Sequence, residues 1–132
     1  MNANFSSFGI RALPSYNFNK SKTTVSFGAD FLGTWLNPVA FSKQFAETRK
    51  LGPKKKEMSR LYSFESNLSL TGANADYRSP IRPSEVGLYV GNLYNLIAAK
   101  AGAPTISVAK VDDTATLTKA ANDLWASKGS SP

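Results

Sequence analysis

The chain has 132 residues, 42% of them hydrophobic and 19% charged, and it contains neither cysteine nor histidine. These absences exclude disulfide scaffolds, thiolate or imidazole metal sites, and catalysis by a Cys nucleophile or a Ser-His-Asp triad. We therefore expect a protein that is not an enzyme and that uses no metal, cofactor or small-molecule substrate. The length is typical of a single domain over residues 1–132.

Positive charge is the main global feature, because 16 Lys and Arg stand against 9 Asp and Glu and give a formal net charge of +7. Such a balance favours nucleic acid or another polyanion as partner. The excess is local, since the stretch from Lys43 to Arg60 holds seven cations and two anions. The seven candidate phosphate-binding residues are Lys43, Arg49, Lys50, Lys54, Lys55, Lys56 and Arg60.

No apolar run approaches the roughly 20 residues that cross a bilayer, and the N-terminus lacks a basic stretch followed by an apolar core. We expect a soluble protein with no membrane partner and no export signal.

The first half of the chain predicts an arm followed by strands. Residues 1–20 mix Asn and Ser with scattered aromatic residues and are broken by Gly9 and Pro14, so we expect an arm or short edge strands. Residues 23–31 alternate apolar and polar side chains, as a half-buried strand does. Residues 38–51 fit a helix or a strand, and we favour a strand because the Gly52-Pro53 breaker and a lysine-rich tip follow, as in a hairpin.

The clearest predicted strand covers residues 61–71. One face carries Tyr62, Phe64, Leu68 and Leu70, and the other carries Ser63, Glu65, Asn67, Ser69 and Thr71. An antiparallel sheet with one solvated face shows this pattern. Amide and hydroxyl groups in such a row suit the recognition of exposed bases, but the wet side of an amphipathic strand shows the same pattern and is the commoner explanation. Residues 71–83 are rich in turn formers and predict a loop or a short strand.

Two helices are predicted for residues 84–128. Ser84 is a candidate N-cap, helical spacing of apolar residues runs to about Lys100, and Gly102 and Pro104 end the helix. A short extended piece at 105–111 leads to a second helix, capped by Asp112, Asp113 or Thr114 and ending at Lys128-Gly129. Gly87 and Gly91 each cost a helix about 1 kcal/mol relative to Ala, so a close neighbour is expected on their face.

The helix face of Gly87, Val90, Gly91 and Tyr94 is the candidate dimer interface. Packing of this face within one chain explains the two glycines equally well. Aromatic residues interleaved with cations, as at Tyr16, Phe18 and Tyr77, suit base stacking in a single-strand binder. Such residues are more often part of a core.

We therefore predict an α+β fold: an arm or edge strands at 1–20, an antiparallel sheet within 21–83, and two C-terminal helices at 84–128 packed on one sheet face, with the sheet completed in a dimer. This order of elements resembles the coat proteins of single-stranded RNA bacteriophages. The residues that carry the likeness are the strand RLYSFESNLSL at 60–70 and the following helix at 84–100. The resemblance implies a homodimer whose sheet binds genomic RNA while the helices interlock. On this likeness Ser63, Glu65 and Asn67 are the candidate RNA-binding residues of the sheet, together with Lys43 and the basic loop. Gly87 and Gly91 would then lie in the dimer contact.

Three functions compete on these observations. The first is a viral structural protein that self-assembles in the host cytoplasm into a virion and packages single-stranded RNA, mainly through phosphate contacts. The second is a single-stranded nucleic-acid-binding protein that does not assemble. The third is a basic linker or accessory subunit of a larger protein assembly.

Overall fold

The computed structural model describes residues 2–131, and Met1 and Pro132 lie outside the described part of the chain. Its elements are α1 Asn2–Phe8, a 3-10 turn η1 Phe18–Lys20, β1 Thr23–Phe27, α2 Pro38–Arg49, β2 Arg60–Glu65, α3 Leu70–Ala73, β3 Tyr77–Pro80, a 3-10 turn η2 Pro83–Glu85, α4 Val86–Ala101 and α5 Thr114–Ala126. No helix among these residues is both long enough and apolar enough to cross a membrane.

The described residues form one three-stranded sheet in the order β1-β2-β3, and both strand pairs are parallel. Thr23 is paired with Arg60, and Tyr62 with Tyr77. The predicted antiparallel α+β fold is therefore wrong, and the protein has an α/β fold. The physical reason is that helices rather than hairpin turns connect the strands, and a helical crossover returns the chain to the same end of the sheet.

Residues 38–49 are helical, which corrects the preference for a strand there. Asn37 caps α2 by accepting a hydrogen bond from Ala40 N at 3.4 Å, and Pro38 occupies the first turn, where its missing N–H costs nothing. Phe41 and Phe45 are both buried, as the four-residue spacing of a helix allows. The helix signals at its start thus outweigh the hairpin-like residues that follow it.

The strand predicted at 61–71 is shorter than expected. β2 ends at Glu65, a bend follows, and Ser69 caps the single turn of α3 by accepting a hydrogen bond from Gly72 N at 3.0 Å. The next strand, β3, lies inside the segment predicted to be a loop or a short strand. Likewise β1 stops at Phe27, because Gly28 takes a left-handed φ of 67° and turns the chain.

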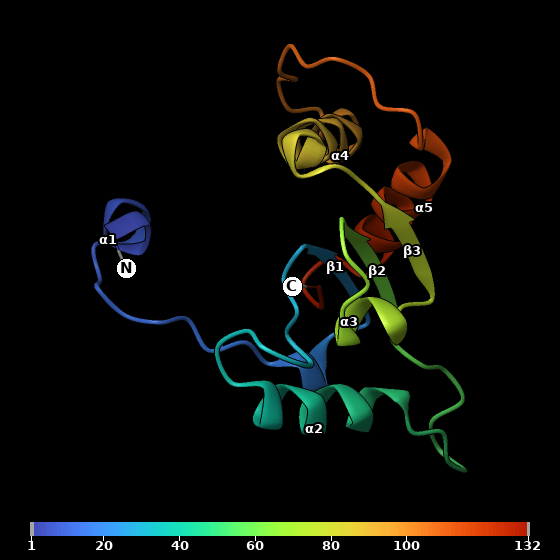
Figure 1. The fold of residues 1–132 in the computed structure, drawn as a ribbon. Coiled ribbons are helices and arrows are strands. Elements are labelled where there is room, and N and C mark those ends of the chain that lie inside the picture. The colour runs from blue at the N-terminus through green and yellow to red at the C-terminus, as the bar shows by residue number, and fades with distance from the viewer. Residues whose placement is uncertain (1, 132) are drawn as a thin grey trace.

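Helices cover both faces of the sheet, with α2 and α3 on one side and α4 and α5 on the other (Figure 1). Tyr62 and Phe64 of β2 belong to the core cluster under α4 and α5. Leu61 belongs to a second cluster with Phe41 and Phe45 of α2. α4 and α5 share one face, but the expectation that the opposite face meets solvent is wrong, because α2 and α3 cover it and a parallel sheet needs both faces covered.

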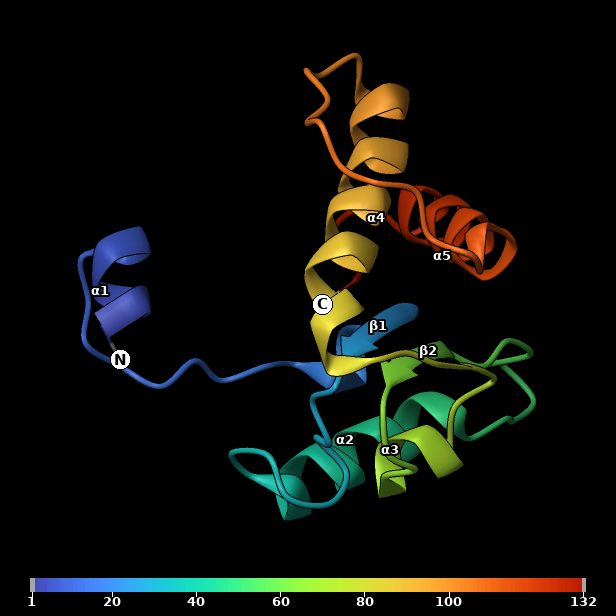
Figure 2. The same cartoon turned by 45° about the horizontal axis from the view of Figure 1, so that its top comes forward.

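The two C-terminal helices lie close to their predicted positions. Ser84 lies in η2, α4 runs from Val86 to Ala101, and Gly102 ends it with a φ of 66°. Asp113 is the N-cap of α5 and accepts a hydrogen bond from Thr116 N at 3.1 Å. The segment between the helices runs back along α4 (Figure 2).

Residues 2–15 stand apart from the rest of the fold. Both views show α1 separated from the sheet and from the other helices by an extended stretch of chain (Figures 1 and 2). No strand occurs among residues 2–20, so the edge-strand alternative is wrong for this described segment. Tyr16 is the first residue packed on the core, beside Trp35.

Candidate functional site

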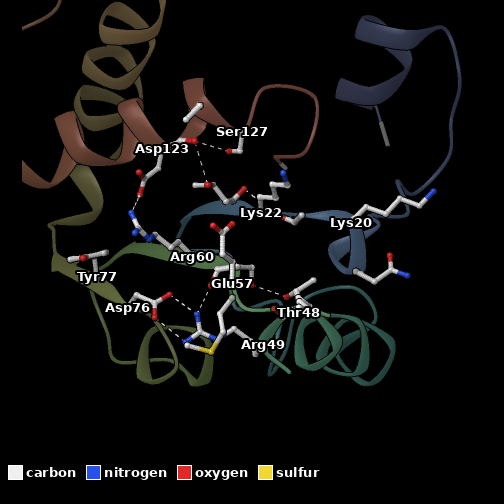
Figure 3. Close-up of a pocket in the computed structure, with 17 residues that line it drawn as sticks. Lys20, Lys22, Thr48, Arg49, Glu57, Arg60, Asp76, Tyr77, Asp123 and Ser127 are labelled. Atoms are coloured by element: carbon white, nitrogen blue, oxygen red, sulfur yellow. Dashed lines mark hydrogen bonds and ion pairs between the residues drawn. The ribbon is translucent and has the colours of Figure 1, made fainter. Parts of the chain in front are cut away.

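All three strands begin at the same end of the sheet, which we call the amino edge. The C-terminal ends of α2 and α5 also reach it, because Thr48 Oγ1 is hydrogen-bonded to Ser59 Oγ at 2.7 Å and Thr23 Oγ1 donates to Asp123 O at 3.4 Å. An open cavity of about 850 Å³ lies between these elements, and five of the residues that line it are cations (Figure 3). They are Lys20, Lys22, Arg49, Lys55 and Arg60.

Aspartates neutralise both arginines at this cavity. Arg49 donates two hydrogen bonds to Asp76, from Nη1 at 2.6 Å and from Nη2 at 2.9 Å, and Leu61 N donates to the same carboxylate at 2.9 Å. Arg60 Nη1 donates to Asp123 at 2.7 Å, and the Tyr62 hydroxyl donates to the same oxygen at 2.6 Å. Arg49, at the end of α2, is therefore paired with Asp76 in the loop before β3. Arg60, at the start of β2, is paired with Asp123 of α5.

Both aspartates are held in the charged state. Partial burial alone would raise the pKa of Asp76, but hydrogen bonds from Arg49 and Leu61 N outweigh it, so the pKa lies below its usual value. Burial acts in the same way on Asp123, and hydrogen bonds from Tyr62 and Arg60 keep the pKa of this carboxyl low as well. These ion pairs persist at neutral pH.

Lys55, in the stretch from Lys43 to Arg60, also has a structural role. Lys55 Nζ donates to the carbonyl oxygens of Glu47 at 2.9 Å and Thr48 at 2.8 Å, near the end of α2. A cation at a helix C-terminus offsets the partial negative charge of the last carbonyl groups.

The other lysines of the loop after α2 point into solvent. Lys50, Lys54 and Lys56 are exposed and form no ion pair within the part of the chain that the structure describes. Lys20 and Lys22 are exposed at the same edge, and Figure 3 shows Lys20 extending away from the cavity. The charge that remains open to a partner at this edge is therefore lysine charge, part of it at the cavity and part on the adjoining loop.

The structure brings only part of the predicted RNA-binding set together. Arg49, Lys55 and Arg60 line the cavity, the three exposed loop lysines adjoin it, and Lys43 is exposed on α2. The predicted recognition row lies at the other end of β2. Ser63 and Glu65 are 1% and 5% exposed, and only Asn67, in the bend beyond the strand, is open to solvent.

Glu65 and Ser63 are enclosed by the chain itself. Glu65 accepts hydrogen bonds from Arg78 Nε at 2.7 Å and Ser69 Oγ at 2.6 Å, and Ser63 Oγ has no hydrogen-bond partner among the described residues. The prediction that this polar face meets solvent is wrong, because α2, α3 and the residues that join them to the sheet cover it.

The aromatic residues considered for base stacking are occupied. Tyr16 packs against Phe18, Trp35 and Phe41, with ring centroids 5.2 to 6.2 Å apart. Tyr77 is stacked on Tyr62 at 4.9 Å, and Lys119 Nζ lies 4.1 Å from the centre of its ring. These rings are engaged in contacts within the chain, although both keep part of their surface exposed.

The candidate dimer face on α4 is half occupied. A Cβ at Gly91 would lie 3.1 Å from Val108 Cγ2, so the segment after α4 is the close neighbour of this glycine. Gly87 has no atom within 4 Å of its Cβ position, and Val90 and Tyr94 are 44% and 45% exposed. The homodimer predicted at these residues stays a prediction.

Sequence reasoning missed the aspartates that neutralise the arginines. Asp76 and Asp123 are isolated in the sequence, and no spacing signal connects them with Arg49 or Arg60. Lys20 and Lys22 carry no separate signal in the sequence, and only the parallel pairing of β1, which they precede, with β2, which begins at Arg60, places them at the amino edge.

Comparison with models of known protein families finds no match. A search of curated proteins finds no significant match either.

Proposed function

We propose that the protein binds a polyanion through the exposed lysines of the amino edge. Single-stranded RNA is the polyanion that we favour. The supporting observation is that the arginines at this edge are paired with carboxylates while the loop lysines are not. Arg49 and Arg60 are engaged with aspartates, while Lys50, Lys54 and Lys56 carry their charge outward and have no ion pair among residues 2–131. Lysine ammonium groups are point charges that bind phosphate without demanding one geometry.

This chemistry implies affinity without sequence choice. Tyr16 and Tyr77 are engaged in aromatic contacts within the chain, so the proposed binding relies on phosphate contacts and not on base stacking. Phosphate contacts then supply the binding free energy through counterion release. Oligo-uridylate and oligo-adenylate of equal length should bind with similar affinity.

The test uses two double variants that remove the same charge from different places. Lys54→Gln with Lys56→Gln alters the amino edge, and Lys100→Gln with Lys110→Gln alters exposed residues at and after the far end of α4. Binding to a fluorescent 20-nucleotide oligo-uridylate is measured against salt. The amino-edge variant should lose about 1.4 from the slope of log affinity against log salt if both lysines contact phosphate.

The control variant should keep the wild-type slope. Equal slopes for the two double variants would overturn the proposal, because the effect would then be one of net charge and not of place. Lys55 is left unchanged in both variants, since it caps α2.

The RNA-packaging coat protein is a second candidate, supported by the apolar residues that α1 and the following chain expose. Phe8 is 76% exposed and Ile10 is 64% exposed, as in a segment that contacts another copy. The parallel sheet removes the antiparallel platform that this function was expected to use. Electron microscopy of the protein expressed alone distinguishes the two candidates: particles that contain host RNA favour a coat protein, and small species favour a binding protein that does not assemble.

A further inference from the structure

The N-terminal arm, residues 2–15, presents large apolar side chains that the body of its own chain leaves exposed. Phe5, Phe8, Ile10 and Leu13 are 49%, 76%, 64% and 62% exposed. Within the described residues, the hydrogen bonds of the arm all stay inside it. A soluble chain rarely exposes several large apolar side chains in one short segment unless they meet a partner.

The arm is already folded. Gly9 takes a left-handed φ of 69° and donates to Phe5 O at 2.8 Å, which closes α1. Asn4 Nδ2 then donates to Ala12 O at 2.8 Å, and the Arg11 guanidinium lies 5.1 Å from the centre of the Phe5 ring. Because the arm is ordered before contact, a partner that binds it loses less conformational entropy on binding.

A second uncovered apolar surface lies on α4 and the segment after it. This surface, the α4 patch, consists of Val90, Tyr94 and Ile106, which are 44%, 45% and 52% exposed. Ile106 is held beside the helix by two hydrogen bonds of 2.8 Å with the Asn95 side chain, and the Tyr94 hydroxyl donates to Pro104 O at 3.0 Å. The patch is therefore rigid as well as exposed.

We propose that the arm of one copy docks on the α4 patch of a second copy. One contact then covers both apolar surfaces, whereas a symmetric α4-to-α4 contact leaves the arm exposed. Residues 2–10 carry no charged side chain, and neither do the three patch residues. In a chain of net charge +7, copies repel unless they meet through neutral surfaces.

The position of the arm favours docking between copies. Both views show α1 away from α4, at the end of an extended tether (Figures 1 and 2). Such a head-to-tail contact closes as a reciprocal dimer or continues into a chain of copies. This inference is independent of RNA binding, and its tests use nuclease-treated protein in high salt.

Cysteine crosslinking tests the contact directly, because the natural sequence has no cysteine. Phe8→Cys or Phe5→Cys in one chain is mixed with Val90→Cys or Ile106→Cys in another and oxidised mildly. The matched control replaces the patch residue by Val39→Cys, at a position 82% exposed on α2. We expect a crosslink between chains for at least one arm–patch pairing, in clear excess over the control.

Failure of all four pairings to exceed the control would overturn the proposal. A double variant, Phe8→Cys with Ile106→Cys in one chain, separates docking within a chain from docking between copies. A product crosslinked only within the chain would also overturn it.

Sedimentation velocity gives a second readout without crosslinks. Wild-type protein should associate with rising concentration, and Phe5→Ser with Phe8→Ser should weaken association at least about tenfold, as expected for loss of two aromatic anchors. Val39→Ser with Leu68→Ser removes exposed apolar side chains elsewhere and should leave association unchanged. A wild-type monomer at every concentration, or equal weakening in the control, would contradict the proposed contact.

Discussion

The Glu65 carboxylate lies so close to Gly72 that a Cβ at position 72 would come within 1.7 Å of Glu65 Oε1. Burial alone would raise the pKa of Glu65, but hydrogen bonds from Ser69 and Arg78 outweigh it and hold the pKa below its usual value. The absence of a side chain at position 72 thus leaves room for a buried charge at the turn between β2 and β3.

Gly72→Ala should destabilise the protein by about 2 kcal/mol, because the new methyl group moves Glu65 off its partners and leaves a buried carboxylate poorly paired. Urea unfolding measures the change. Gly52→Ala is the control, since no atom lies within 4 Å of a Cβ at that position. Equal unfolding free energies for the two variants would show that Glu65 moves freely.

The two glycines of α4 should respond differently to alanine. Gly87→Ala should stabilise the protein by about 0.5–1 kcal/mol, because its Cβ position is open and alanine favours a helix. Gly91→Ala should gain less or lose stability, since its methyl group would lie 3.1 Å from Val108 Cγ2. Thermal unfolding at low protein concentration tests both changes. A destabilised Gly87→Ala variant would contradict the open position.

Asp123→Ala should cost about 1–3 kcal/mol, mainly because it leaves the hydroxyl of the fully buried Tyr62 without its partner. The ion pair with Arg60 adds little, because that side chain is 53% exposed. Asp112→Ala, at an exposed position two residues before α5, is the matched control. Chemical denaturation compares the two variants, and similar losses would show that Tyr62 does not depend on Asp123.

Stability should be nearly constant from about pH 6 to 8 and should fall as the solution becomes more acid. The chain has no histidine, so no side chain with an ordinary pKa titrates in that range. The pKa values of five carboxyl groups are lowered by hydrogen bonds that outweigh burial, in Asp30, Glu65, Asp76, Asp113 and Asp123.

The lowered pKa values determine whether stability rises or falls with pH. A carboxyl group with a lowered pKa stabilises the folded state above its unfolded pKa, near 3.8 for Asp, and loses that contribution as the pH falls through the folded value. The Tm measured from pH 3 to 8 should therefore decline only below about pH 5. A Tm maximum in acid would contradict these pairings.

Local signals in the sequence identified the C-terminal helices well. Gly102 ends α4 in the left-handed conformation that favours glycine, and Asp113 caps α5 as one of three candidates. The same kind of signal, Asn37 before Pro38, begins α2, whereas the hairpin-like residues after the helix favour a strand and mislead the prediction there. Helix caps are local contacts, which is why the sequence reveals them.

The direction of the strands depended on contacts distant in the sequence. The alternation in 61–65 correctly separates the Tyr62 and Phe64 face from the Ser63 and Glu65 face. Alternation predicts faces but not burial, because a polar face is buried when its groups find partners, as Glu65 does in Arg78 and Ser69. The charge excess between Lys43 and Arg60 can be read from the sequence, but the pairing of Arg49 with Asp76 and of Arg60 with Asp123 has no local signal.

Lysine footprinting in the presence of RNA tests the central claim most directly. The protein is acetylated briefly with and without excess 20-nucleotide oligo-uridylate, and each lysine is quantified by mass spectrometry. Binding at the amino edge predicts that Lys50, Lys54 and Lys56 are protected while Lys100 and Lys110 react as before. Equal protection of all five lysines, or protection of Lys100 and Lys110 alone, would contradict it.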